Sequence, residues 1–167
     1  MKKILCIVFL VFAFSIHAQN ADFNQNSNFN IEANIGYTVG DSSGKYSFAT
    51  TASGYYLKEV FDGSKFGGSI SYVYYFAKEG GAPAVDSASF FPFSFAARFE
   101  ILNDVTFGGD IGYAFGITPS VNKGGVFHRV MIGYDINDRI QFTVSTFGIA
   151  AKTNGFSNFS FGLMLAL

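Results

Sequence analysis

Cysteine is nearly absent from this 167-residue chain, and the single one, Cys6, lies in the N-terminal apolar run. No disulfide framework or cysteine-based metal site is therefore expected. The only histidines are His17 and His128, which leaves few imidazole groups for metal ligation or acid–base chemistry. Charged residues make up 14% of the chain and the net charge is −1, so nothing indicates a nucleic-acid-binding surface. We expect no cofactor and no metal.

The first residues have the features of a secretory signal peptide. Lysines at 2 and 3 precede an apolar run at residues 4–14, and the segment SIHA follows and ends in Ala18. About 11 apolar residues in a helix rise only about 17 Å, well short of the ~30 Å bilayer core, so cleavage after Ala18 is favoured over a membrane anchor. The Asn-rich residues 19–28 are too polar to form a core, and we expect a flexible lead-in there. The expected organisation is a signal peptide at 1–18, the lead-in at 19–28 and one folded domain at 29–167.

The last residues alternate between large apolar and small or polar side chains. In a β-strand this period of two places one set of side chains on each face. The large apolar set here is Phe159, Phe161, Leu163, Leu165 and Leu167. Similar alternation predicts strands at about 29–39, 46–60, 66–76, 89–101, 105–117, 126–136, 140–150 and 158–167.

The connections between these stretches alternate short and long. Short ones, rich in Asp, Asn and Gly, occur at 62–64, 102–104 and 137–139, and longer ones at 40–45, 77–88, 118–125 and 151–157. Outer-membrane barrels combine tight periplasmic turns with longer outer loops. After the signal segment no apolar run approaches the ~18 residues of a membrane helix, so a spanning fold has to be a barrel. We expect an all-β, eight-stranded antiparallel up-and-down transmembrane β-barrel with both termini in the periplasm.

A soluble lipocalin-like barrel or a β-sandwich is the alternative fold. Either would turn the apolar face inward and expose long polar side chains. The polar face of this chain is instead made largely of small residues, which fit a crowded lumen, although the lack of Trp departs from the usual interfacial belts. Examples are Ser94, Ala96, Gly108, Gly112, Gly116, Thr143 and Ser145. The membrane barrel is favoured.

The turn at 102–104 predicts a register. As a three-residue turn it pairs Ile101 with Val105, and it places Arg98 opposite Gly108 with Asp110 on the diagonal.

Two strands are less regular. The second requires Tyr46 and the alternate residues up to Tyr56 to face lipid. In the seventh, the apolar parity shifts between Val144 and Phe147, which indicates a bulge or a strand end.

Six charged residues fall on the inward parity and form a candidate lumen network. Because an isolated buried charge costs several kcal/mol, we expect Arg98 to pair with Asp110 and Glu100, and Arg129 with an acidic residue across the lumen. A gated ion path is the alternative, but eight strands leave a lumen just wide enough for its side chains. The six are Glu32, Arg98, Glu100, Asp110, Arg129 and Asp135.

The alternation over residues 29–167, together with the C-terminal strand, resembles the small eight-stranded outer-membrane barrels of the OmpA/OmpX type, in the broad outer membrane protein beta-barrel families. The resemblance implies the outer membrane of a Gram-negative bacterium, contact with outer-membrane lipid, and insertion by the barrel-assembly machinery. That machinery recognises a terminal strand like residues 159–167. The signal usually ends in an aromatic residue, whereas this chain ends in Leu167.

No family catalytic motif accompanies the resemblance, so we expect a non-enzymatic protein. Its expected role is structural or in surface interaction, in adhesion or membrane integrity, with an extracellular partner bound by the outer loops. A small porin-like pore is one alternative. A lipid A-modifying enzyme is another, but it needs a Ser-His-acid group. His128 shares the lipid-facing parity of Val126 and Val130 and lacks the His-x-Ser-Asn pattern.

Overall fold

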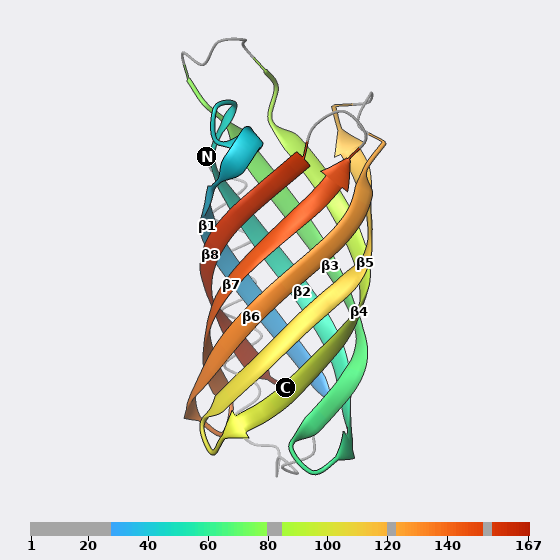
Figure 1. The fold of residues 1–167 in the computed structure, drawn as a ribbon, viewed down its shortest axis with the longest axis vertical. Helices are drawn as coiled ribbons and strands as arrows, with labels where there is room; N and C mark the ends of the chain where they lie inside the picture. Colours follow the sequence, from blue (N-terminus) through green and yellow to red (C-terminus); the bar gives the residue numbers. More distant parts are fainter. Residues whose placement is uncertain (1–27, 80–84, 120–122, 152–154) are drawn as a thin grey trace.

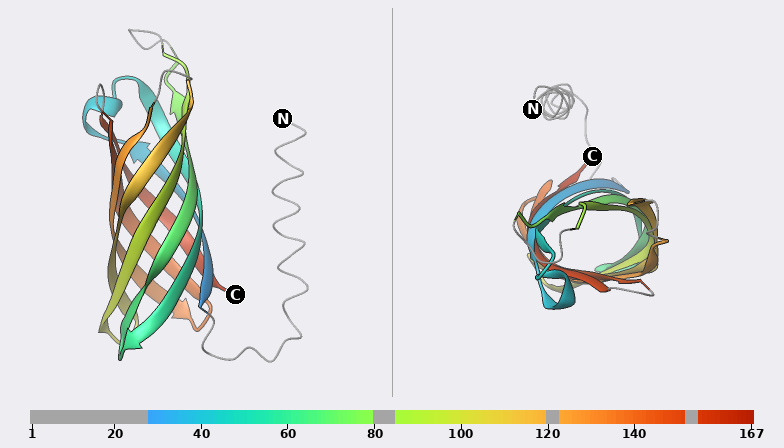
Figure 2. Two further views of the ribbon diagram at one scale, coloured as in Figure 1. Left: turned by 90° about the vertical axis from the view of Figure 1, so that its right-hand side faces the viewer. Right: turned by 90° about the horizontal axis from the view of Figure 1, so that it is seen from above.

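The protein forms a closed barrel of antiparallel strands that follow one another in chain order, with β1 beside β8 (Figures 1 and 2). The computed structural model describes residues 28–79, 85–119, 123–151 and 155–167, so the expected signal peptide and all but Asn28 of the lead-in lie outside the described residues. The strands are β1 (Phe29–Thr38), β2 (Tyr46–Phe61), β3 (Ser64–Ala77), β4 (Ala88–Leu102), β5 (Val105–Thr118), β6 (Gly125–Asn137), β7 (Ile140–Ala151) and β8 (Gly155–Ala166). The predicted fold class is confirmed.

Every predicted strand is present, and its ends differ by at most three residues from the observed bounds. The regular alternation of side chains explains this agreement, because it predicts a strand and its two faces together. No helix within the described ranges is long and apolar enough to cross a membrane.

The strands are strongly staggered around the barrel. A row of paired residues that starts at Asn30 passes through all eight strands and reaches β8 at Phe156, whereas Asn30 itself pairs with Ala166 of β8, ten residues further along. Such a stagger tilts the strands against the barrel axis, by about 35–45° in outer-membrane barrels. The tilt is visible in Figure 1. The row consists of Asn30, Tyr55, Ser69, Ser94, Gly112, Phe127, Ile149 and Phe156.

Three tight hairpins lie at one end of the barrel, which we call the hairpin end; the opposite end is the loop end (Figure 1). Phe29 also lies at the hairpin end, where its carbonyl oxygen accepts a 3.0 Å hydrogen bond from the Leu167 amide. Each hairpin turns through two residues, at 62–63, 103–104 and 138–139, and each has a register shift just before the turn.

The shift corrects one predicted pair. The three-residue turn with Ile101 opposite Val105 is wrong, because Leu102 pairs with Val105 and Ile101 occupies the irregular position. Beyond the bulge the register is as predicted, with Arg98 opposite Gly108. The bulge adds one residue, Ile101, to β4. This shifts the pairs beyond it by one position and returns them to the predicted register.

An equivalent backbone hydrogen bond joins each of the three hairpins to the strand that follows it. The carbonyl of the second turn residue accepts a bond from a backbone amide of the next hairpin or of β8. The three bonds are Glu100 N to Gly63 O at 2.7 Å, Asp135 N to Asp104 O at 2.8 Å, and Ala166 N to Arg139 O at 2.9 Å.

Large apolar side chains cover the outer wall. Ile35 on β1, Ile111 on β5 and Ile132 on β6 are each more than half exposed, at 58%, 63% and 53%. The predicted assembly strand follows the same rule, because Phe159, Phe161, Leu163 and Leu167 are exposed and Leu165 is half-buried. A water-soluble barrel would leave this much apolar surface in solvent.

Two strands deviate from the expected parity at the loop end. Tyr46 is buried rather than lipid-facing, because the ladder between β2 and β3 shifts register between Tyr46 and Ala49. In β7 the pairing runs without a shift past Val144, so the apolar change at Phe147 is neither a bulge nor a strand end. Phe147 points inward and is 3% exposed.

Candidate functional site in the barrel lumen

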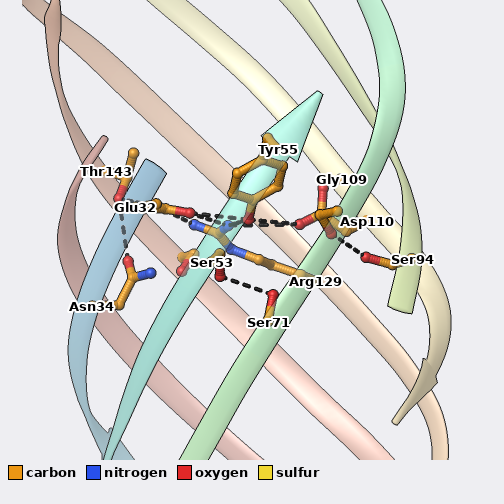
Figure 3. Close-up of polar contacts among 12 residues, drawn as sticks. Glu32, Asn34, Ser53, Tyr55, Ser71, Ser94, Gly109, Asp110, Arg129 and Thr143 are labelled. Carbon is orange, nitrogen blue, oxygen red and sulfur yellow. Dashed lines mark hydrogen bonds and ion pairs between the residues drawn. The ribbon is translucent and has the colours of Figure 1, made fainter. Parts of the chain in front are cut away.

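The central feature of the lumen is an ion pair between Arg129 on β6 and Glu32 on β1 (Figure 3). Arg129 Nη1 and Nη2 each donate to one Glu32 carboxylate oxygen, both at 2.6 Å. The two strands are not neighbours in the barrel, so the pair spans the lumen. A bidentate guanidinium–carboxylate pair is among the strongest and most directional polar contacts in proteins.

Two hydroxyl groups complete the surroundings of the Glu32 carboxylate. Tyr55 Oη donates to Oε2 at 3.0 Å, and Thr143 Oγ1 donates to Oε1 at 2.7 Å. Arg129 Nη1 also donates to Tyr55 Oη. Glu32 is 3% exposed, and its carboxylate is therefore held by groups from β2, β6 and β7 rather than by solvent.

A second pair lies beside the first. Arg98 Nη1 on β4 donates to Asp110 Oδ1 on β5 at 2.6 Å, and Arg98 Cζ lies 5.1 Å from the centre of the Tyr55 ring. Asp110 Oδ2 lies 3.6 Å from Arg129 Nη1 and 3.3 Å from Tyr55 Oη, a second acceptor within reach of the one Tyr55 hydroxyl proton, so the two pairs form one network. Two carboxylates balance two guanidinium groups, and this pairing offsets part of the desolvation cost of burying four charges.

The structure places the other two predicted network residues elsewhere. Glu100 and Asp135 lie on the inward parity at the mouth of the hairpin end, where both line a polar cavity of about 300 Å³. Asp135 Oδ1 accepts a 2.7 Å bond from Gln141, and Glu100 is exposed. Four of the six candidates therefore meet in the lumen and two stand at its entrance.

Towards the loop end the lumen is filled by an apolar cluster that sequence reasoning missed. Its rings pack edge to face or tilted: Phe156 lies 4.7 Å from Phe90 and 5.1 Å from Tyr75, centre to centre. The buried members are Tyr46, Ala49, Val73, Tyr75, Ala88, Phe90, Ala114, Phe127, Phe147, Ile149 and Phe156. We call this group the aromatic plug. The position of Phe127 in the aromatic plug could have been predicted from strand parity, because Phe127 lies two residues before Arg129 and so shares its inward face.

His128 lies on the outer wall, as its parity predicted. Its cross-strand neighbours are Ile111 and Gly148, which carry neither a hydroxyl nor a carboxylate. Within the parts of the chain that the structure describes, no group of three or more His, Cys, Asp or Glu side chains is arranged to hold a metal ion.

The first long connection is ordered against the barrel. A short 3-10 turn, η2 (Gly40–Ser42), places the Ser42 hydroxyl 2.9 Å from the Ser157 carbonyl oxygen, and the Ser157 amide donates to that hydroxyl at 3.2 Å. Ser42 is 2% exposed. This loop is therefore attached to β8 at the loop end.

Comparison with known proteins identifies the fold alone. No family model matches the chain, and no curated protein matches it. A solved structure described as "De novo design of transmembrane beta-barrels" has a TM-score of 0.55 and 8% identity, covering 86% of this chain and 98% of that one. A structure described as "KdgM porin in complex with disordered oligogalacturonate" has a TM-score of 0.37 and 10% identity, covering 83% and 99%. The chain is thus an eight-stranded closed barrel similar to transmembrane β-barrels.

Proposed function

We propose that this protein is an integral outer-membrane β-barrel of the small OmpA/OmpX-like type, with both termini in the periplasm. Its role is to anchor a set of surface loops for adhesion or membrane integrity, without enzymatic activity. The observation that carries the proposal is the reversed distribution of polarity: charged groups are buried in the lumen while Phe, Ile and Leu side chains cover the outer wall. In a bilayer that apolar wall is solvated by lipid and the backbone is satisfied by the closed ladder.

Two successive layers support a filled lumen rather than a pore. The ion pair of Arg129 and Glu32 crosses the lumen, and the aromatic plug lies beyond it towards the loop end. A solute entering from the cavity at the hairpin end would have to break the first layer and displace the second. The close packing of both layers favours an anchoring role.

The loop end supports presentation of a surface. The bonds between Ser42 and Ser157 fix the first connection to β8, which limits the entropy lost when a partner binds. Loops held by a rigid scaffold are common binding elements. The partner we propose is an extracellular macromolecule that contacts these connections.

The test is planar-bilayer conductance of the detergent-refolded protein. A heat-modifiable gel band and β-type circular dichroism first establish that the barrel has folded. A folded barrel that stays electrically silent agrees with the filled lumen. Discrete channels whose conductance changes in Arg98→Ala would replace the anchoring role with that of a small pore.

The same preparation tests the membrane location and the lack of enzymatic activity. A protein that stays soluble and monomeric without detergent would contradict a membrane barrel. Expression in a Gram-negative host should leave the mass of lipid A unchanged. A mass shift that His128→Ala abolishes would identify a lipid A-modifying enzyme instead.

A further inference from the structure

An apolar groove crosses the outer wall near the hairpin end, over β1, β2 and β3 to β4. It has a volume of about 740 Å³. This size falls within the ~300–1,000 Å³ of typical ligand sites. Its exposed lining side chains include Phe29, Ile31, Tyr56, Ile70, Phe93 and Leu167.

Two glycines, Gly54 and Gly68, form part of the floor of the groove. Gly54 pairs with Ile70, and Gly68 pairs with Tyr56, so the two lie diagonally on adjacent strands. A Cβ atom at Gly54 would meet nothing within 4 Å, and one at Gly68 would come only to 3.7 Å of a backbone oxygen. By contrast, a Cβ at the preceding residue, Gly67, would collide with the Tyr56 backbone. Crowding therefore does not require glycine at 54 or 68, and the space above them is open.

One lysine, Lys58, lies on β2 between this groove and the turn that joins β2 to β3. Lys58 follows Tyr56 by two residues on the same face of β2 and pairs with Phe66, so about 7 Å of strand separates its level from that of Gly68. Lys58 is exposed, and no ion pair to it occurs among the described residues. Near the end of a membrane strand, a lysine extends its ammonium group to the headgroup level.

We propose that the groove binds one phospholipid, with an acyl chain over Gly54 and Gly68 and the phosphate at Lys58. The inference rests on the proposed membrane location. The apolar lining matches the acyl chain of the lipid, which needs no hydrogen bonds, and the Lys58 ammonium group matches the phosphate. Because Lys58 brings a positive charge to the headgroup level, the site prefers an anionic headgroup such as phosphatidylglycerol over zwitterionic phosphatidylcholine.

The test is native mass spectrometry of the refolded full chain in detergent, titrated with phosphatidylglycerol or phosphatidylcholine. The wild-type barrel should retain one phosphatidylglycerol. Gly54→Val/Gly68→Val should weaken its retention tenfold or more, because side chains that start from these two open Cβ positions occupy the floor of the groove. Lys58→Gln should weaken it about fivefold, the effect of one lysine near an anionic surface. The matched controls are Ala150→Val on the outer wall of β7 and Lys65→Gln at the lumen mouth, which should both bind as the wild type does.

Each other outcome overturns the site. Equal retention of both lipids by all variants would mean that lipid covers the wall without selection. A dimer that Gly54→Val/Gly68→Val abolishes would assign the groove to a second copy of the chain. A chain that gives no heat-modifiable band contradicts the membrane barrel itself, which distinguishes that failure from loss of lipid binding in a folded variant.

Discussion

Arg129 and Glu32 lie on strands that do not touch in the sheet, yet their side chains meet in two 2.6 Å contacts across the lumen. The pair therefore ties opposite walls of the barrel together. Backbone ladders connect only neighbouring strands, so this contact adds a constraint that the sheet itself does not supply.

Arg129→Met should destabilise the barrel by about 3–5 kcal/mol, because it leaves the buried Glu32 carboxylate without its cation. Urea unfolding in detergent micelles, followed by the heat-modifiable band, measures the change. The double variant Arg129→Met/Glu32→Met should recover most of the loss. Lys65→Met removes a charge at the exposed lumen mouth and serves as the control. A single variant as stable as the wild type would show that the pair contributes nothing.

Phe156→Ala should cost about 3–5 kcal/mol of unfolding free energy, because it opens a cavity in the aromatic plug. Phe159→Ala, on the outer face of the same strand, should cost less, since lipid or detergent fills the space. The same urea titration compares the two. Neither variant should conduct in a planar bilayer, because the layer of Arg129 and Glu32 remains. Equal losses at the two positions would contradict a packed plug.

Gly112→Ala should prevent or strongly reduce folding. A Cβ atom there would strike the backbone of Phe93 and Ser94 on the neighbouring strand, which a flexible side chain cannot relieve. Gly54→Ala is the control, because its Cβ would meet nothing within 4 Å. The fraction of heat-modifiable protein after refolding measures both. A normal yield for Gly112→Ala would show that β4 and β5 separate more easily than their register indicates.

Gly63→Ala should destabilise the protein by about 1–2 kcal/mol, the cost of a left-handed backbone for a residue with a Cβ atom. Gly63 has a φ of 67° in the turn between β2 and β3. Gly44→Ala is the matched control, because Gly44 has no such φ and open space around it. The difference between the urea midpoints of the two variants tests the left-handed conformation of Gly63. A Gly63→Ala variant as stable as the wild type would mean that this turn adopts another conformation.

The strands and their two faces could be predicted from the sequence because alternation is a local property. The diagonal contact of Arg98 with Asp110 followed from one hairpin register. The partner of Arg129 could not be identified in the same way, since Glu32 is reached across the lumen and depends on the stagger of the whole barrel.

Aromatic residues were the main source of error. In a regular strand Tyr46 shares the parity of Tyr56, which predicts that it faces lipid. A register shift turns it inward instead, where it lies 5.4 Å from Phe156, centre to centre. Parity counted from Arg129 would have placed Phe127 and Phe147 correctly, but Tyr46 required knowledge of the irregular ladder.

The bond that recurs at Gly63, Asp104 and Arg139 makes the hairpin a modular unit of construction. Each hairpin is bonded to the next strand in the same manner. Because the strands follow one another in chain order, β1 and β8 are the neighbouring strands that no connection joins. There Leu167 donates to Phe29 at 3.0 Å. A short peptide linker between these two strands would turn the chain into a covalent ring with all ladders preserved. Any one of the long connections could then be cut to give a circular permutant of the same barrel.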